Sequence, residues 1–299
     1  MLLLTLGSAA GGGVPQWNCA CPGCSGARAH PDRRRSHDSL AVLGEGSSSW
    51  FLVNAGPDVT DQMETHPALL PGPGERRTPV VRVLLTDAEL DHTLGLLRLR
   101  EAHHLEIFAT APVRQALRER LALDTVLTPY TTLSWHDLPL VGAGPPARVA
   151  GVEVSAVPLS SKRPRYAASA PEDDAWVVAV HAHDPGHGTT ALYAPALAAW
   201  SDAFGEAVAG ADCLLIDGTF WDDEEPQRLG ISSRTATGMG HLPVHGPGGT
   251  AERLAPLPAR CLYTHLNNTN PLNDPASWHH GHLAARGLEV ARDGMVIQL

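Results

Sequence analysis

The sequence predicts an α/β fold, and three segments support that prediction. Apolar, strand-like runs end in polar residues within 81–95, 212–219 and 261–271. In the first of these, acids and a histidine follow the run, and leucines at helical spacing come next. Proteins of the α/β class place their chemistry where a strand ends in a polar loop before a helix. We therefore expect a functional site at these strand ends.

Length and composition indicate a globular protein. The 299 residues are 43% hydrophobic and 18% charged, which suffices to bury a core. The formal net charge of −10 argues against nucleic acid or an anionic membrane as a partner. The first strand lacks the charged leader of a signal peptide, and no apolar run is long enough to span a membrane. With five cysteines, an odd number, no disulfide framework is expected, and we predict a cytoplasmic protein.

Three cysteines lie close together after a glycine-rich loop at 7–13. Cys19, Cys21 and Cys24 follow the spacing Cys-x-Cys-x-x-Cys in a Pro-Gly loop. Three thiolates at one point suit tetrahedral zinc, and the fourth ligand would come from a distant segment. The alternative is a set of small buried side chains or a redox pair. Buried cysteines do not usually cluster in such a loop, so the sequence predicts a structural zinc site within 17–24.

The other elements follow from periodicity and turn residues. A hairpin is predicted for 40–43 with 50–53, then a short helix over 58–65 and a Pro/Gly linker over 67–78. The C-terminal segment 290–297 is predicted to be a closing hairpin on an Asp-Gly turn. Further strands are expected at 106–110, 138–141, 152–157, 176–181 and 190–193, and helices at 111–123 and 196–208.

A basic patch interrupts the middle of this acidic chain. Lys162, Arg163 and Arg165 lie within 159–166, and Lys162 is the only lysine in the sequence. Such a run is often a solvated loop, yet arginine also binds carboxylates in a bidentate manner. The patch is therefore either a surface loop or a binding site for an acidic substrate.

Potential metal ligands stand at the three strand ends named above. They are Asp91 with His92, Asp217, and His265. Loops at one edge of a sandwich of sheets converge, so we expect these four side chains to share a metal. Two imidazoles with one or two carboxylates suit non-haem iron(II), and the same set tolerates zinc or manganese. The alternative of acidic helix caps and unrelated turn residues accounts less well for a pattern that occurs three times.

One segment resembles a degenerate form of the metallo-β-lactamase superfamily motif Thr-His-x-His-x-Asp-His. It is Thr86-Asp87-Ala88-Glu89-Leu90-Asp91-His92. Asp91 and His92 match the last two ligands of the motif. Asp87 and Glu89 stand where the motif has the two histidines of its hydrolytic metal, which puts hydrolysis in doubt.

The superfamily resemblance also has implications for the rest of the chain. It implies that Asp217 is the bridging aspartate and that His265 is the last histidine. The third histidine of the first metal should fall near 159–161, where the sequence has none. For the fold, it implies an αββα sandwich of two mixed sheets flanked by helices, formed as a single domain by residues 1–299.

Longer motifs resemble the PqqB family of pyrroloquinoline quinone (PQQ) biosynthesis. They include 7–19 with the next two cysteines, 91–97, 239–242 and 265–271, and so span nearly the whole chain. The resemblance implies an iron-dependent oxygenase that uses O₂ to hydroxylate the tyrosine of a small Glu-Tyr precursor. Fe(II) would lie at the four strand-end ligands and Zn(II) at the cysteine loop.

The same resemblance implies roles for further residues. Asp217 and His241 would be catalytic, with His241 as an acid/base or a substrate contact, because imidazole titrates near neutrality. Lys162, Arg163 or Arg165 would bind the carboxylates of the substrate. The sequence is compatible with a homodimer and does not determine how many subunits assemble.

Two alternative functions also stay open. One is a metal-dependent hydrolase of the same superfamily, in which Asp87 and Glu89 bind a second metal through oxygen. The other is a non-catalytic carrier that assists transport of PQQ or its precursor to the periplasm. Hydrolysis needs no O₂, so an anaerobic assay separates the hydrolase. Under the carrier model, a variant that lacks Asp217 should still bind the ligand and show no defect in oxygen consumption.

Overall fold

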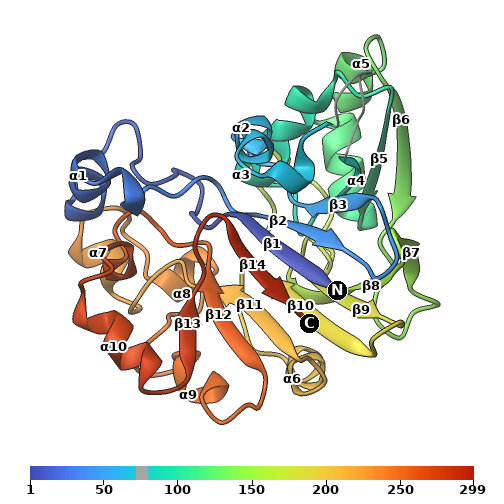
Figure 1. Cartoon of the computed structure of the whole chain (residues 1–299). Helices are drawn as coiled ribbons and strands as arrows, with labels where there is room; N and C mark the ends of the chain where they lie inside the picture. The colour runs from blue at the N-terminus through green and yellow to red at the C-terminus, as the bar shows by residue number, and fades with distance from the viewer. Residues whose placement is uncertain (72–79) are drawn as a thin grey trace.

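Two seven-stranded sheets form the centre of the computed structural model, which describes residues 1–71 and 80–299 (Figure 1). The first sheet has the order β14 (Met295–Gln298), β1 (Leu2–Gly7), β2 (Ser39–Leu43), β3 (Trp50–Val53), β4 (Val80–Leu84), β5 (His104–Ala109) and β6 (Thr132–Asp137). The second has the order β13 (Leu288–Val290), β12 (Arg260–Thr264), β11 (Cys213–Asp217), β10 (Thr189–Ala194), β9 (Val177–Asp184), β8 (Val152–Ser160) and β7 (Ala147–Val149).

Both sheets are mixed, which confirms the predicted architecture. In the first sheet β3 to β6 are parallel and β14 to β3 are antiparallel. In the second, β10 to β13 are parallel and β7 to β10 are antiparallel. Alternate side chains of facing strands, such as Leu3, Phe51, Val180 and Leu215, are buried in one hydrophobic core between the sheets.

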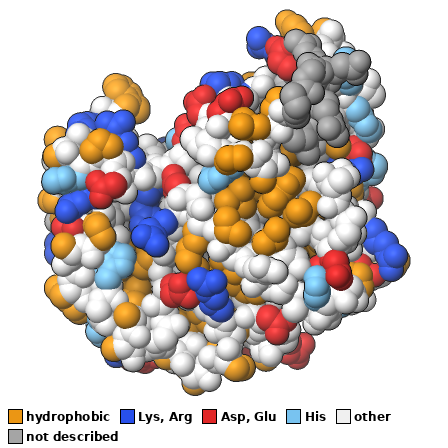
Figure 2. Space-filling model, viewed as in Figure 1, with side chains coloured by type: hydrophobic (Ala, Val, Ile, Leu, Met, Phe, Trp, Pro, Cys, Tyr) orange, Lys and Arg blue, Asp and Glu red, His pale blue; other side chains and the backbone are white. Residues whose placement is uncertain are grey.

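Helices cover the outer faces of both sheets. Val113 and Leu117 pack α4 on the first sheet, and Phe204 and Val208 pack α6 on the second. Hydrophobic side chains nevertheless remain visible over β1 and β2 (Figure 2). The α-helices are α1 (Pro22–Ala29), α2 (Val59–Glu64), α3 (Leu90–Thr93), α4 (Ala111–Glu119), α5 (Leu123–Leu127), α6 (Asp202–Ala209), α7 (Glu225–Arg228), α8 (Ala236–Met239), α9 (Ala251–Leu254) and α10 (Trp278–Ala284). The 3₁₀ turns are η1 (Pro31–Arg33), η2 (Pro67–Leu69), η3 (Leu94–Leu99), η4 (Arg165–Ala167) and η5 (Pro271–Asn273).

Most predicted elements are found, including the β2–β3 hairpin, in which Leu40 pairs with Val53. The predicted closing hairpin is wrong: β13 pairs with β12 in one sheet, and β14 pairs with β1 in the other. Gly294 lies on the crossing between the sheets, where its N–H donates to Thr5 O over 2.8 Å. Of the predicted linker, residues 72–78 lie outside the described part of the chain.

Three other boundaries differ from the prediction. Residues 138–141 form only an isolated bridge between Leu140 and Ala156, because Pro139 has no N–H to extend a ladder. The helix expected over 111–123 ends at Glu119, and the left-handed Ala122 (φ 50°) separates it from α5. The helix expected from 196 begins at Asp202, after the N-cap Ser201.

In the described residues, no helix is long and apolar enough to cross a membrane.

Gly95 fixes the position of the segment that carries the Asp91-His92 pair. Its N–H donates to Ala55 O over 2.8 Å, and a Cβ atom on it would lie 2.1 Å from Gly56 O. We expect Gly95→Ala to lower the free energy of unfolding by about 1–3 kcal/mol, because the backbone must move to relieve the overlap. Urea denaturation measures this loss. Gly144→Ala is the control, since no atom lies within 4 Å of the place that its added methyl group would take, and equal stability of the two variants would contradict the argument.

Candidate metal centre

One cavity of about 210 Å³ at one edge of the two sheets is lined by five of the eight residues predicted for the active site. Asp91 and His92 belong to α3, which follows β4 of the first sheet, and His265 directly follows β12 of the second. Lys162 and His241 also line this cavity. The site is thus assembled from both sheets, at the ends of strands that are distant in the sequence.

Asp91, His92 and His265 form a compact group of potential ligands. One ligand atom of each lies within 4.8 Å of the others. Asp91 Oδ2 is 3.7 Å from His92 Nε2 and 3.6 Å from His265 Nε2. Both Nε2 atoms are buried and have no hydrogen-bond partner among the described residues. Because an unpaired buried polar atom is costly, these two nitrogens and the carboxylate fit a metal ion.

Asp87 lies behind His92 on the side away from this group. His92 Nδ1 is 2.7 Å from Asp87 Oδ2, which also accepts a hydrogen bond from Thr86 Oγ1. A carboxylate that accepts from the far nitrogen of a ligating histidine is a common support for a metal site. Burial opposes charging of His92, but the carboxylates of Asp87 and Asp91 raise its pKa to about 10. Asp87 occupies a position at which the superfamily motif has a metal ligand. In this protein it instead orients the neighbouring His92.

Asp217 lies apart from the first group. It forms a second group with His241 and His265, again within 4.8 Å. Protein groups already bind both of its carboxylate oxygens. Oδ1 accepts from Thr219 N and Oγ1, and Oδ2 accepts from Leu197 N and His241 Nδ1. The four side chains expected to share one metal therefore divide into two groups that have only His265 in common. His265 itself has a left-handed backbone (φ 58°), a strained conformation that often marks a functional residue.

Of the three residues in the basic patch, Lys162 alone lines the cavity. Lys162 lines the cavity and packs on Gly240, whose added Cβ would lie 3.0 Å from Lys162 Cδ. Arg163 instead donates to Ala170 O over 2.6 Å and is absent from the cavity lining, as is the exposed Arg165. Sequence reasoning missed Tyr166, which donates to Ala88 O over 2.6 Å and so ties this loop to the metal segment.

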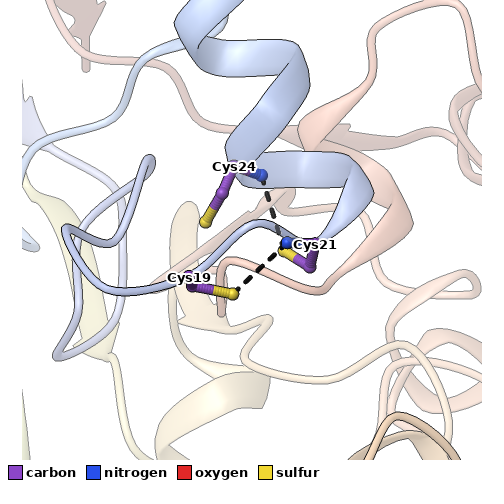
Figure 3. A group of neighbouring side chains, drawn as sticks. All are labelled: Cys19, Cys21 and Cys24. Carbon is purple, nitrogen blue, oxygen red and sulfur yellow. Dashed lines mark hydrogen bonds between the residues drawn. The ribbon is translucent and has the colours of Figure 1, made fainter.

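The three cysteines point toward one another beside α1 (Figure 3). Cys21 N donates to Cys19 Sγ, and Cys24 N donates to Cys21 Sγ, both over 3.5 Å. The side-chain nitrogen of Asn268 lies 3.2, 3.4 and 3.3 Å from the sulfurs of Cys19, Cys21 and Cys24. Asn268 is thus the distant residue that faces all three thiols, and an amide has no sequence signal that marks it as a ligand.

Glu225 supports the loop that carries Asn268. Its two carboxylate oxygens accept from Thr269 Oγ1 and Trp221 N, each over 2.7 Å. Burial raises the pKa of Glu225 from 4.5 to about 7. The folded state therefore binds this proton more tightly than the unfolded state does, and the corresponding stability is present below pH 4.5 and is lost as the pH rises through about 7.

We expect Glu225→Gln to remove this component of the pH dependence. We compare the free energy of unfolding of the parent with that of the variant. The parent minus variant difference should fall by up to about 3 kcal/mol as the pH rises from 4.5 through about 7. Urea denaturation at a series of pH values measures the difference. Glu206→Gln, at an exposed position on α6, serves as control. Parallel curves for the parent and Glu225→Gln would contradict the assignment.

Comparisons with known proteins agree with this fold. Residues 49–266 match the family model described as a beta-lactamase superfamily domain. Two relatives named coenzyme PQQ synthesis protein B, from Azoarcus sp. (strain BH72) and Nitrosococcus oceani, are 44% and 40% identical over the whole of both chains. The crystal structure of Zn²⁺-bound PqqB from Methylobacterium extorquens is 34% identical over both full chains, with a TM-score of 0.89. A diphosphatase of the PhnP family shares the fold at 18% identity and a TM-score of 0.69, over all of this chain and 97% of its own.

Proposed function

The chain belongs to the coenzyme PQQ synthesis protein B family of the metallo-β-lactamase superfamily, and we propose that it is an iron-dependent oxygenase that hydroxylates the tyrosine of a Glu-Tyr precursor of PQQ. The proposal is supported by two buried Nε2 atoms, of His92 and His265, that face Asp91 Oδ2 and have no hydrogen-bond partner in the described part of the chain. His92, His265 and Asp91 would hold the ion.

The ligand set favours iron over a hydrolytic pair of metals. Two histidines and one carboxylate with open positions are the set that non-haem Fe(II) oxygenases use. When bound, Fe(II) supplies the activation of O₂, which side chains alone do not provide. At the neighbouring positions Asp87 is held by His92 and Thr86, and this engagement disfavours a second metal there. The same ligand set also tolerates zinc, so zinc is expected to compete with iron; the relative from Methylobacterium extorquens was solved with Zn²⁺ bound.

The cavity lining suits a tyrosine with a nearby carboxylate. Val177, Phe220 and Met239 supply an apolar wall against which a phenol ring would pack. Lys162 lies on the same cavity and would pair with a carboxylate of the substrate. His241 Nδ1 is bonded to Asp217, so its other nitrogen, Nε2, would exchange a proton with the phenol.

The proposal includes a structural zinc at Cys19, Cys21 and Cys24 with Asn268 as the fourth ligand. In a tetrahedral site with Zn–S of about 2.3 Å and Zn–O of about 2.0 Å, the oxygen lies about 3.5 Å from each sulfur. The amide atom of Asn268 that faces the thiols is 3.2–3.4 Å from them. Rotation of the amide by half a turn exchanges its nitrogen and oxygen, which would place Oδ1 at the fourth vertex.

Oxygen uptake on a Glu-Tyr peptide tests the proposed activity. The protein is loaded anaerobically with Fe(II), and ascorbate supplies the two electrons that reduce the second oxygen atom to water. We expect consumption of O₂ and gain of one oxygen atom on the tyrosine, measured with an oxygen electrode and mass spectrometry. Turnover of the peptide without O₂ would favour the hydrolase, and binding without turnover would favour the carrier; either result would contradict the proposal.

A further inference from the structure

The hydroxyl of Thr219 lies at the centre of the buried network behind His265. Thr219 Oγ1 is 2.6 Å from Asp217 Oδ1, 2.9 Å from His265 Nδ1 and 3.1 Å from His241 Nδ1. Thr219 is 3% exposed and Asp217 is fully buried. Water therefore does not compete for these contacts, and the protein groups must satisfy one another.

Counting donors and acceptors fixes where the protons are. Each oxygen of Asp217 already accepts from a backbone N–H, Oδ1 from Thr219 and Oδ2 from Leu197, and a carboxylate has no donor of its own. The single O–H of Thr219 must then point at Asp217 Oδ1. The oxygen of that hydroxyl can only accept from His265, so the proton of the His265 ring is on Nδ1.

The consequence concerns the opposite nitrogen of the same ring. A neutral imidazole with its proton on Nδ1 has a free electron pair on Nε2. His265 Nε2 is the buried atom that has no hydrogen-bond partner among the described residues and lies 3.6 Å from Asp91 Oδ2. The proton position set by Thr219 is therefore the one that a metal ligand requires.

We propose that Thr219 is a positioning residue that transmits the charge of Asp217 to His265 and holds that ring with Nε2 free for the metal. The proposal rests on the proposed metal centre and adds to it the means by which one ligand is prepared. His92 receives the same support directly from Asp87 over 2.7 Å. The two histidines are thus oriented by carboxylates in two ways, one by direct contact and one through a hydroxyl.

Thr219→Val keeps the shape of the side chain and removes the hydroxyl, whereas Thr219→Ser keeps the hydroxyl. ¹⁵N NMR of the metal-free protein at alkaline pH distinguishes a protonated from an unprotonated ring nitrogen. We expect His265 in the parent and in Thr219→Ser to carry its proton on Nδ1 and, in Thr219→Val, to populate the form with the proton on Nε2. Fe(II) and Zn(II) should each bind Thr219→Val about 10–100-fold more weakly, with affinity restored in Thr219→Ser.

Thr110→Val is the matched control, because Thr110 is also buried and its hydroxyl donates to Ala175 O over 2.7 Å, away from the cavity. It should lose stability without a change in metal affinity. If Thr219→Val does not fold, Thr219→Ala provides the same measurements. An unchanged His265 tautomer and metal affinity in a folded variant would overturn the proposal and leave the metal centre standing. Absence of metal at His265 in the parent would instead refute the metal centre itself.

Discussion

The His92→Ala protein is expected to lose its active-site metal while it retains the zinc of the cysteine loop. His92 supplies one of only two unpaired buried imidazole nitrogens that, among the described residues, face Asp91. A change in the partners behind a ligand costs about 10–100-fold in metal affinity, so removal of the ligand itself should cost more than about 100-fold. Metal analysis by mass spectrometry after dialysis measures the bound iron and zinc separately.

The same substitution leaves Asp87 without its histidine partner. Asp87 is 2% exposed, and a buried carboxylate without its cation is destabilising, so thermal unfolding should also occur at a lower temperature. His103→Ala is the control, because His103 is exposed, belongs to none of the groups of potential metal ligands among the described residues and does not line the cavity. Iron content equal to that of the parent would show that the ligand assignment is wrong.

The Cys24→Ser protein is expected to lose the cysteine zinc and to unfold more easily. Cys24 is fully buried at the start of α1, and its sulfur is 3.3 Å from the Asn268 amide. Loss of a structural metal is among the few single changes that cost more than about 4 kcal/mol. Zinc content and urea denaturation measure the two effects on the same preparation.

A buried cysteine elsewhere provides the comparison. Cys261 is buried in β12, and its thiol donates to Ala259 O over 3.4 Å. Cys261→Ser should keep the full zinc content and lose no more than about 1–3 kcal/mol, the cost of a disturbed buried polar group. If Cys24→Ser kept its zinc, or if both variants lost stability equally, the cysteine loop would not be a metal site.

The sequence was sufficient to predict the architecture and the segments of the site. Strand-like runs that end in acids and histidines identified the loops after β4, β11 and β12, because hydrophobic periodicity and turn chemistry are local properties. The Cys-x-Cys-x-x-Cys spacing likewise identified a cluster whose thiols do converge. The resemblance of long motifs then predicted the family correctly.

Features that depend on three-dimensional partners could not be predicted. Asp217 has the strand-end position of a ligand, yet its oxygens are taken by Leu197, Thr219 and His241. Arg163 belongs to the basic run that was expected to bind substrate, but its guanidinium donates a hydrogen bond to a backbone carbonyl instead. Asn268 is one of several asparagines in the 265–271 segment, and only the packing of that segment on α1 distinguishes it.

The crossing of the N-terminal loop with the loop after β12 determines when the site can form. Ala10 N donates to Leu266 O, and Leu266 N donates to Ser8 O, each over 2.9 Å. His265 and Asn268 both lie on this late segment, so a nascent chain that has not yet released it from the ribosome lacks a ligand of the proposed iron site and the fourth ligand of the proposed zinc site. Contacts of such sequence separation also form slowly. Loading of either proposed metal would therefore belong to the last stage of folding, after almost the whole polypeptide has been synthesised.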